Sequence, residues 1–265
     1  MATSLPETLT HPVRQPAGDG LSMSGLSELR ASNLVDLVFE QVRAAILDKS
    51  LAPGLRVTEA GLAKHLNVSK TPVREALLRL RQIGLIEDDG RRGGRVIAPS
   101  QIAIEHAFEV REALEAFTAA AAAERATEDE RASIAVAARQ SLEGAEAGDR
   151  TAFSHWDGVF HERIASATAN PRLMSLIDDT CALIAALRTR DLPHSGASVE
   201  CARGHVAIAT AIEARDATRA AGEMRAHLRK VKEYVLEALA DVLDTSARTR
   251  MTLTANPHRE RGAGR

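Results

Sequence analysis

Apolar residues recur at helical spacing along most of the 265-residue chain. Near the N-terminus this spacing predicts one helix over residues 34–46, a short second helix over residues 59–65 and a third over residues 70–83. A tight turn separates the second helix from the third. The pattern then changes, because residues 85–87 and 95–98 read as two short strands joined by a loop. This order of elements predicts a winged helix-turn-helix with a two-stranded wing.

No strand pattern follows the hairpin, and five to seven helices fit the periodicity of the remaining chain. The predicted fold class is therefore mainly α, with an all-α antiparallel helical bundle after the winged helix-turn-helix. We place the two domains at residues 33–98 and 102–244. The Pro- and Gly-containing residues 1–32 and the Arg-rich residues 245–265 are predicted to be a disordered arm and a disordered basic tail.

Charge divides the chain in the same place. Residues 34–98 hold 11 Lys and Arg against 8 Asp and Glu, whereas residues 104–244 hold 16 against 24. The first part can meet a polyanion that the second part would repel. Aromatic residues make up only 3% of the chain, which disfavours base stacking on single-stranded nucleic acid.

Composition also disfavours membrane and secreted classes. No apolar run approaches the roughly 18–20 residues that span a bilayer, and no secretory leader pattern opens the chain. Cys181 and Cys201 form neither a CxxC pair nor a disulfide framework. We therefore expect a cytoplasmic protein with no membrane partner.

The start of the third predicted helix carries the residues expected to contact double-stranded DNA. In a helix-turn-helix, this end enters the major groove. Lys70 and Arg74 share one helix face, and Ser69 can cap the helix or donate to a phosphate. The adjoining Thr71 completes this set. The alternative is a solvated basic helix in an ordinary small domain.

The loop over residues 88–94 is the second candidate DNA contact. Arg91 and Arg92 supply cations there. Gly93 and Gly94 would let the backbone approach a groove closely.

Three histidines and one aspartate stand out in the acidic part. Asp157 and His161 lie four residues apart on one helix face. His205 and His227 lie about equally far from one helix–helix turn, roughly 14 to 15 Å, so antiparallel helices present them at one height. Together they suit Zn²⁺, or another divalent metal ion such as Ni²⁺ or Mn²⁺, and no thiolate enters the set. By spacing alone, ordinary helix-face residues remain the alternative.

The residues of the first domain also carry a resemblance. The runs Leu62–Leu77, Gly84–Ile86 and Arg91–Val96 closely resemble the DNA-binding domain of GntR-family bacterial transcription regulators. The resemblance implies a homodimer on a pseudo-palindromic operator. Lys70 stands where the family usually has Arg, and Gly61 where many members carry a charge, so the operator sequence stays open.

The second domain resembles the FCD sensor domain of the FadR-type branch of that family. The matching pieces, over about residues 102–240, are Val110–Glu115, Asp157 with Phe160-His161, Asn170 with Leu173, His205, Ala211-Ile212 with Asp216, Met224, and His227-Leu228. Metal-containing members use one Asp and three His at these positions, which implies that Asp157, His161, His205 and His227 bind one ion.

An Arg of the first FCD motif lines the effector pocket in that branch, which assigns Arg111 to an effector carboxylate. A helix-surface pair of Arg111 with Glu115 is the alternative. Asn170 faces the same pocket or holds a loop. Trp156 and Phe160 are expected in the core.

The leading hypothesis is a ligand-responsive transcription regulator without enzymatic activity, in the commoner case a repressor. Its effector would be a small carboxylate or sugar acid. The alternative is a helical metalloenzyme with an appended DNA-binding domain, although the chain has no HExxH motif and no motif places a general base. A ligand-free architectural DNA binder would not need an acidic domain with clustered metal ligands.

Overall fold

A computed structural model describes residues 25–189 and 195–254, including the side chains of residues 34–189 and 196–245. Within these ranges the chain forms nine helices and one small antiparallel sheet, which confirms the predicted fold class. None of the described helices combines the length and apolarity needed to cross a membrane. Most of the two predicted tails lies outside the described residues, but residues 25–32 and 245–254 are helical.

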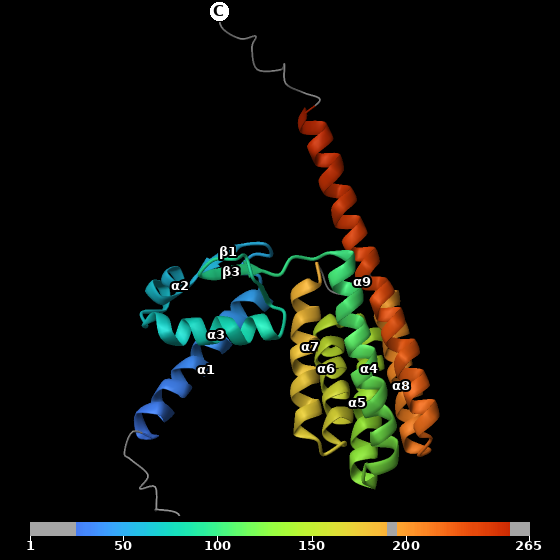
Figure 1. The fold of residues 1–265 in the computed structure, drawn as a ribbon. Coiled ribbons are helices and arrows are strands. Elements are labelled where there is room, and N and C mark those ends of the chain that lie inside the picture. Colours follow the sequence, from blue (N-terminus) through green and yellow to red (C-terminus); the bar gives the residue numbers. More distant parts are fainter. Residues whose placement is uncertain (1–24, 190–194, 255–265) are drawn as a thin grey trace, which may run out of the picture.

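The N-terminal module, residues 25–98, contains three helices and three strands. Their bounds are α1 Gly25–Leu47, β1 Arg56–Thr58, α2 Glu59–Leu66, α3 Lys70–Gln82, β2 Ile86–Glu87 and β3 Gly93–Val96. The sheet has the order β1-β3-β2, with both pairings antiparallel. Figure 1 labels β1 and the central strand β3. The sequence did not predict β1, because three residues carry too little alternation to be recognised.

The two glycines of the wing lie in β3, so the prediction that they belong to an exposed loop is wrong. Gly93 has a φ of +135°, and a Cβ there would lie 2.2 Å from the carbonyl oxygen of Val57. A Cβ on Gly94 would lie 2.6 Å from the carbonyl oxygen of Glu87. Both residues are buried. Their lack of a side chain therefore serves the close pairing of three strands rather than approach to a groove.

The helical bundle follows from residue 101 onward. Its helices are α4 Gln101–Arg125, α5 Glu128–Glu146, α6 Arg150–Ser166, α7 Pro171–Leu187, α8 Ser195–Glu213 and α9 Ala217–Thr254. Polar caps define where several of them begin. Thr127 and Glu130 form a reciprocal capping box at α5, and Asp149 accepts hydrogen bonds from two backbone N–H groups at α6.

Small side chains bring the bundle helices close together. One core cluster is rich in fully buried alanines, among them Ala119, Ala122, Ala137 and Ala211. Phe160 is completely buried in this cluster and Trp156 packs against it, as predicted. Because helix backbones approach closely here, side chains from α6, α8 and α9 can meet at one point.

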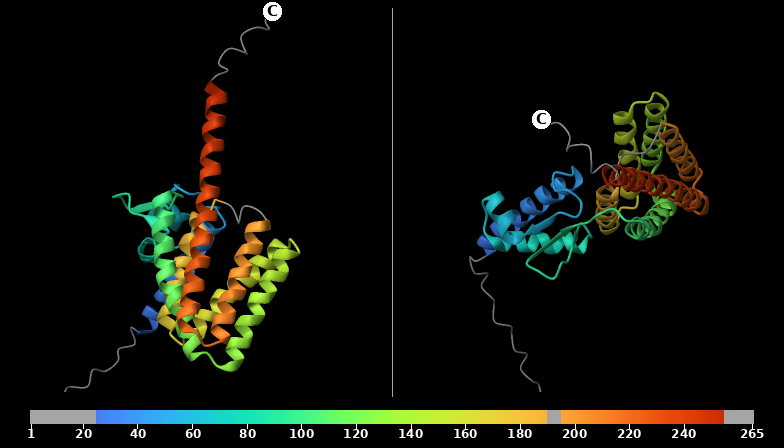
Figure 2. Two further views of the ribbon diagram at one scale, coloured as in Figure 1. Left: turned by 90° about the vertical axis from the view of Figure 1, so that its right-hand side faces the viewer. Right: turned by 90° about the horizontal axis from the view of Figure 1, so that it is seen from above.

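Helix α7 lies on the side of the bundle that faces the N-terminal module (Figure 1). The Lys49 ammonium donates to the carbonyl oxygens of Ala185, at 3.1 Å, and Ala186. Arg43 of α1 pairs with Asp178 at 2.8 Å. At the other side of the bundle, α9 extends well beyond the ends of its neighbours (Figure 2).

Candidate functional site

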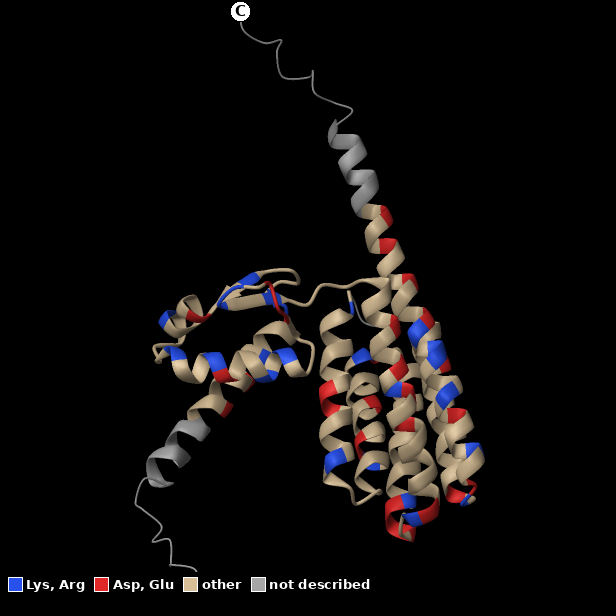
Figure 3. Cartoon of the chain, in the orientation of Figure 1, with Lys and Arg blue, Asp and Glu red and all other residues tan. Residues whose placement is uncertain are grey.

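The start of α3 presents a polar face to solvent. Ser69, Lys70, Thr71 and Arg74 are all exposed, whereas the opposite face of the helix is buried, at Pro72, Val73, Ala76, Leu77 and Leu80. Ser69 occupies the N-cap position, but its side chain makes no capping hydrogen bond within the described residues. Lys and Arg residues are frequent along α3 and the neighbouring sheet (Figure 3). The predicted DNA-binding residues of α3 therefore share one accessible surface.

Arg74 has a partner that the sequence did not reveal. Its Nε and Nη2 atoms each donate to one carboxylate oxygen of Glu59 at 3.1 Å. This hydrogen bond lowers the pKa of Glu59. Glu59 is the first residue of α2 and only 11% of its side chain is exposed, against 55% for Arg74. The fork holds the Arg74 guanidinium in one orientation at the surface.

The exposed loop of the wing is shorter than predicted. It spans residues 88–92 and carries Arg91 and Arg92, both exposed. Asp89 holds the loop against the sheet, because its carboxylate pairs with Arg56 at 2.9 Å. The two wing arginines thus project from an anchored loop.

Helices α6, α8 and α9 bring three histidines together. The ring centroids lie 4.7 Å apart for His205 and His227, 5.3 Å for His161 and His205, and 5.4 Å for His161 and His227. All three rings are buried. The Asp157 carboxylate lies 3.3 Å from Nε2 of His205. The structure therefore brings all four predicted metal ligands into one cluster, which we call the histidine cluster.

Hydrogen bonds orient two of these rings. The only proton of the Ser141 hydroxyl goes to the carbonyl oxygen of Ala138, so that hydroxyl accepts from Nδ1 of His205 at 2.9 Å. The Glu115 carboxylate accepts from Nδ1 of His161. In a neutral imidazole, a proton on Nδ1 leaves a lone pair on Nε2. Both Nε2 atoms are therefore electron-pair donors.

The lone pair on Nε2 of His161 is buried and accepts no hydrogen bond from the described residues. Burial lowers the pKa of His205 and lowers that of His227 well below its usual value, which keeps both rings neutral. Burial would raise the pKa of Asp157, but the combined electrostatic effect of His205, His161 and Arg111 outweighs this and holds that pKa well below its usual range. Neutral imidazoles around an ionised carboxylate form a donor set that a divalent cation fits.

The absence of a side chain at Gly204 leaves room for the ring of His227. A Cβ on Gly204 would lie 2.8 Å from Nδ1 of His227, so any side chain there would push the ring away. Sequence reasoning missed this residue, as it missed Ser141 and Glu115. Each lies on a helix face without a recognisable motif, and only the packing shows which ring it contacts.

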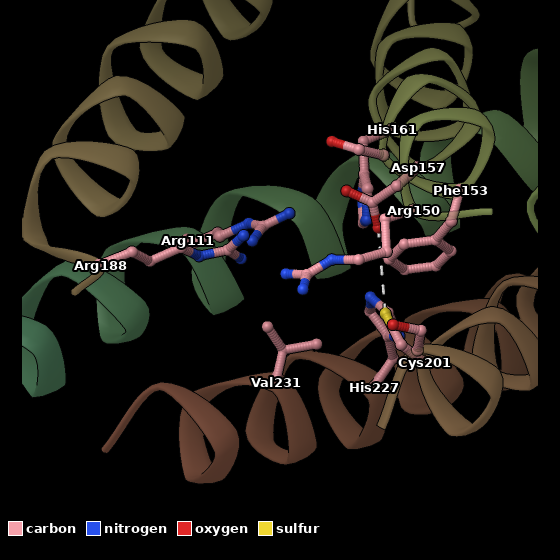
Figure 4. A pocket seen from close by; sticks show the side chains of 11 residues that line it. Arg111, Arg150, Phe153, Asp157, His161, Arg188, Cys201, His227 and Val231 are labelled. Atoms are coloured by element: carbon pink, nitrogen blue, oxygen red, sulfur yellow. Dashed lines mark hydrogen bonds between the residues drawn. The ribbon is translucent and has the colours of Figure 1, made fainter. Parts of the chain in front are cut away.

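A cavity beside the histidine cluster is rich in arginine. Arg111, Arg150 and Arg188 point their guanidinium groups into the same space, which is bordered by Asp157 and His227 (Figure 4). Arg111 is buried and pairs with the buried Glu115. It therefore combines the partner expected of a surface residue with the burial expected of a pocket residue.

Sequence reasoning missed two of these cations, Arg150 and Arg188. Arg188 is the more deeply involved of the two, because it also lines a second cavity. It is the C-cap of α7, and burial lowers its pKa. Its Nε atom is buried and has no hydrogen-bond partner among the described residues. The second cavity shares Arg111, Asp157, His161 and Arg188 with the first and is also lined by the apolar side chains Met174, Ile177 and Ile184.

Asn170 does not line either cavity. It is exposed and is the N-cap of α7, where its side-chain oxygen accepts from the backbone N–H groups of Arg172 and Leu173. Its assignment to the effector pocket is therefore wrong. The reason is local, because Asn followed by Pro at the first helical turn is a strong helix-start signal.

Two families match the chain in the order of its two modules. The family described as bacterial regulatory proteins, gntR family, matches residues 34–96, and the FCD domain matches residues 106–230. The HTH-type transcriptional repressor RspR of Escherichia coli K12 is 26% identical over 198 residues, covering 75% of this chain and 87% of RspR. The Nta operon transcriptional regulator of Aminobacter aminovorans is 30% identical over 191 residues, covering 71% and 87% of the two chains.

A solved structure shares the fold. E. coli McbR/YncC superposes with a TM-score of 0.61 at 20% identity, covering 77% of this chain and 97% of that chain. The arrangement of a winged helix-turn-helix before a six-helix bundle is thus a known architecture.

Proposed function

The chain belongs to the GntR family of bacterial transcriptional regulators and contains an FCD domain, and from this premise we propose that it is a repressor controlled by a small organic acid. As a homodimer it presents two copies of α3 to the half-sites of an operator in double-stranded DNA. Ser69, Lys70, Thr71 and Arg74 contact the groove and its phosphates, and Arg91 and Arg92 contact the adjacent backbone.

The histidine cluster holds a divalent cation, with Zn²⁺ the first choice for its imidazole-rich set. His161, His205, His227 and Asp157 are the ligands. The observation that carries this proposal is the buried Nε2 of His161, which faces the cluster without a proton donor. Glu115 and Ser141 fix the two ring orientations from outside. When bound, the ion supplies a Lewis acid to which an effector carboxylate can attach.

The effector is a carboxylate or sugar acid because cations surround the space next to the cluster. Glu115 already neutralises Arg111, whereas Nε of Arg188 has no partner among the described residues. A buried guanidinium binds a carboxylate well through two parallel hydrogen bonds. Arg188 is therefore the residue to which we assign direct recognition of the acid, with Arg111 orienting Glu115 and His161.

Helix α7 connects the cavity with the DNA-binding module. Its last residues carry Arg188 on one side, and the carbonyl oxygens of Ala185 and Ala186 bind Lys49 on the other. An acid that draws Arg188 toward the ion shifts the end of α7 against α1. Effector binding then favours one placement of the N-terminal module over another.

A screen tests this function. Zinc-loaded protein is heated with a panel of small acids, and a ligand at about 100 times its Kd should stabilise the fold by about 2.7 kcal/mol. The acid that binds is then added to operator DNA and protein in a gel-shift titration, and recovered for mass analysis. Altered operator affinity with unchanged acid supports the regulator, whereas chemical conversion of the acid would establish a metalloenzyme.

Replacing both wing arginines with alanine should flatten the salt dependence of operator binding. Each phosphate contact releases counterions and contributes about 0.9 to the slope of log affinity against log salt, so the double variant should lose up to about 2. The measurement is operator affinity by fluorescence anisotropy at several salt concentrations. Arg219→Ala, in the exposed part of α9, is the control and should leave the slope unchanged. An unaltered slope in the double variant would show that the wing does not contact DNA.

The Lys49→Asn variant should weaken the response to effector. Lys49 has a φ of 66°, and Asn tolerates this left-handed conformation, so the loop is preserved while the contacts with α7 are lost. Coupling of about 0.5–2 kcal/mol should disappear, measured as the ratio of operator affinities with and without effector. Arg43→Ala removes the ion pairs with Asp178 and Glu40, whose carboxylates are both exposed, and should change the ratio little. Equal ratios in wild type and Lys49→Asn would exclude this contact as the connection.

A further inference from the structure

We propose that Cys201 is an additional ligand of the same metal ion, through its thiolate sulfur. The inference rests on the proposed metal site and adds to it a ligand type that the Asp and three His do not provide. No cysteine entered the ligand set expected from the sequence. The structure places one beside it, on α8, one helical turn before His205.

The sulfur of Cys201 lies close enough to two cluster atoms for all three to bind one ion. Sγ of Cys201 is 3.9 Å from Oδ1 of Asp157 (Figure 4) and 3.9 Å from Nε2 of His205. Those two atoms are 3.3 Å apart. Neighbouring ligand atoms around one five-coordinate ion, with bonds of about 2.0 to 2.3 Å at angles of roughly 90° to 120°, lie about 2.9 to 3.8 Å from each other. The triangle of oxygen, nitrogen and sulfur therefore needs to contract by only a few tenths of an ångström to share one ion.

The surroundings favour coordination over a role as inert packing. Cys201 is only 4% exposed, so its sulfur faces the interior of the bundle and not solvent. It adjoins two atoms that carry lone pairs, and the buried Nε2 of His161 lies in the same cluster without a partner. Two sets of potential ligands, His161 with His205 and His227, and Asp157 with Cys201 and His205, share His205. One ion can thus draw on both sets.

Metal binding removes the thiol proton of Cys201 and does not change the oxidation state of the sulfur. The S–H bond breaks, the sulfur electron pair forms the bond to the metal, and the proton leaves to solvent without any electron transfer. A thiolate makes the site softer than a set of imidazoles and a carboxylate. Such a site prefers Zn²⁺ and disfavours Mn²⁺.

Cobalt is the probe for the thiolate. The metal-free full-length protein is loaded with one equivalent of Co²⁺, and its near-ultraviolet spectrum is recorded. Sulfur bound to Co²⁺ gives an intense charge-transfer band that nitrogen and oxygen ligands do not give. We expect the band in wild type and in Cys181→Ser, the matched control whose sulfur lies outside both ligand sets. We expect its loss in Cys201→Ser, together with at least about a tenfold fall in Zn²⁺ affinity in a chelator competition.

Wild-type protein alone provides a second readout, should Cys201→Ser fold poorly. Zn²⁺ should slow alkylation of Cys201 by iodoacetamide at least tenfold while leaving Cys181 unaffected, as read by peptide mass spectrometry. One bound Co²⁺ without the charge-transfer band would overturn the role of Cys201 and leave the metal site standing. Absence of any bound Co²⁺ in wild type would overturn both. Equal alkylation of Cys201 with and without Zn²⁺ would also refute the inference.

Discussion

The double variant His161→Ala/His227→Ala should lose its metal entirely, whereas wild type should carry about one divalent ion per chain. Each histidine comes from a different helix, so two substitutions leave too few ligands on neighbouring elements to close a site. The ion also ties α6, α8 and α9 together. Zn²⁺ at 100 times its Kd should therefore stabilise wild type by about 2.7 kcal/mol, or roughly 5 to 11 °C in Tm, and the double variant not at all.

Elemental analysis after purification without chelator and thermal denaturation with and without Zn²⁺ provide the two measurements. His155→Ala is the matched control, because this exposed histidine lies on α6 as His161 does, outside the cluster. It should keep both the ion and the thermal shift. Each single variant should lower the affinity without removing binding. Unchanged metal content in the double variant would show that His161 and His227 do not bind the ion.

A third variant tests whether operator binding is independent of the histidine cluster. The single variant His205→Ala should lose its response to effector and still bind operator DNA. The reason is that α3 packs against α1, α2 and the small sheet, and no residue of the histidine cluster lies in these elements. Loss of operator binding in a variant that keeps its helical content would contradict this independence.

The Arg74→Ala variant should weaken operator binding by about 1–3 kcal/mol, a factor of roughly 5 to 150, without unfolding the protein. The Arg74 side chain is more than half exposed and Glu59 holds its fork in place. The substitution removes a cation at the groove and leaves behind an anion, Glu59, that DNA repels. Operator affinity is measured by gel shift at one fixed salt concentration.

Two companion variants identify the origin of the loss. Arg74→Ala combined with Glu59→Gln removes the remaining anion, and the share of the lost affinity that returns measures its repulsion. Arg74→Lys keeps the charge without the fork and should recover non-specific more than specific binding. Arg79→Ala, farther along α3 and stacked on Phe39, serves as the control and should retain most operator affinity. Wild-type affinity in Arg74→Ala would rule out this residue as a groove contact.

The sequence by itself predicted the order of the helices and of the hairpin, the division into two modules and the four residues that meet in the histidine cluster, but not β1. Helical periodicity and capping residues such as Thr127 are local, and so is the i, i+4 spacing of Asp157 and His161. Equal distances from one turn were enough to bring His205 next to His227, since antiparallel helices share a fixed rise per residue.

Only the tertiary structure decided what surrounds those residues. The contacts of His161 with Glu115 and of Cys201 with Asp157 join α4 with α6 and α8 with α6, and helix rotation and packing distance set them. The same holds for Glu59 beneath Arg74, for Arg188 at the cavity and for the three-stranded pairing that buries Gly93. Such contacts depend on how neighbouring helices and strands rotate against one another. Periodicity within one element contains no information about that rotation, because it is fixed by the shape of all the side chains that pack between them.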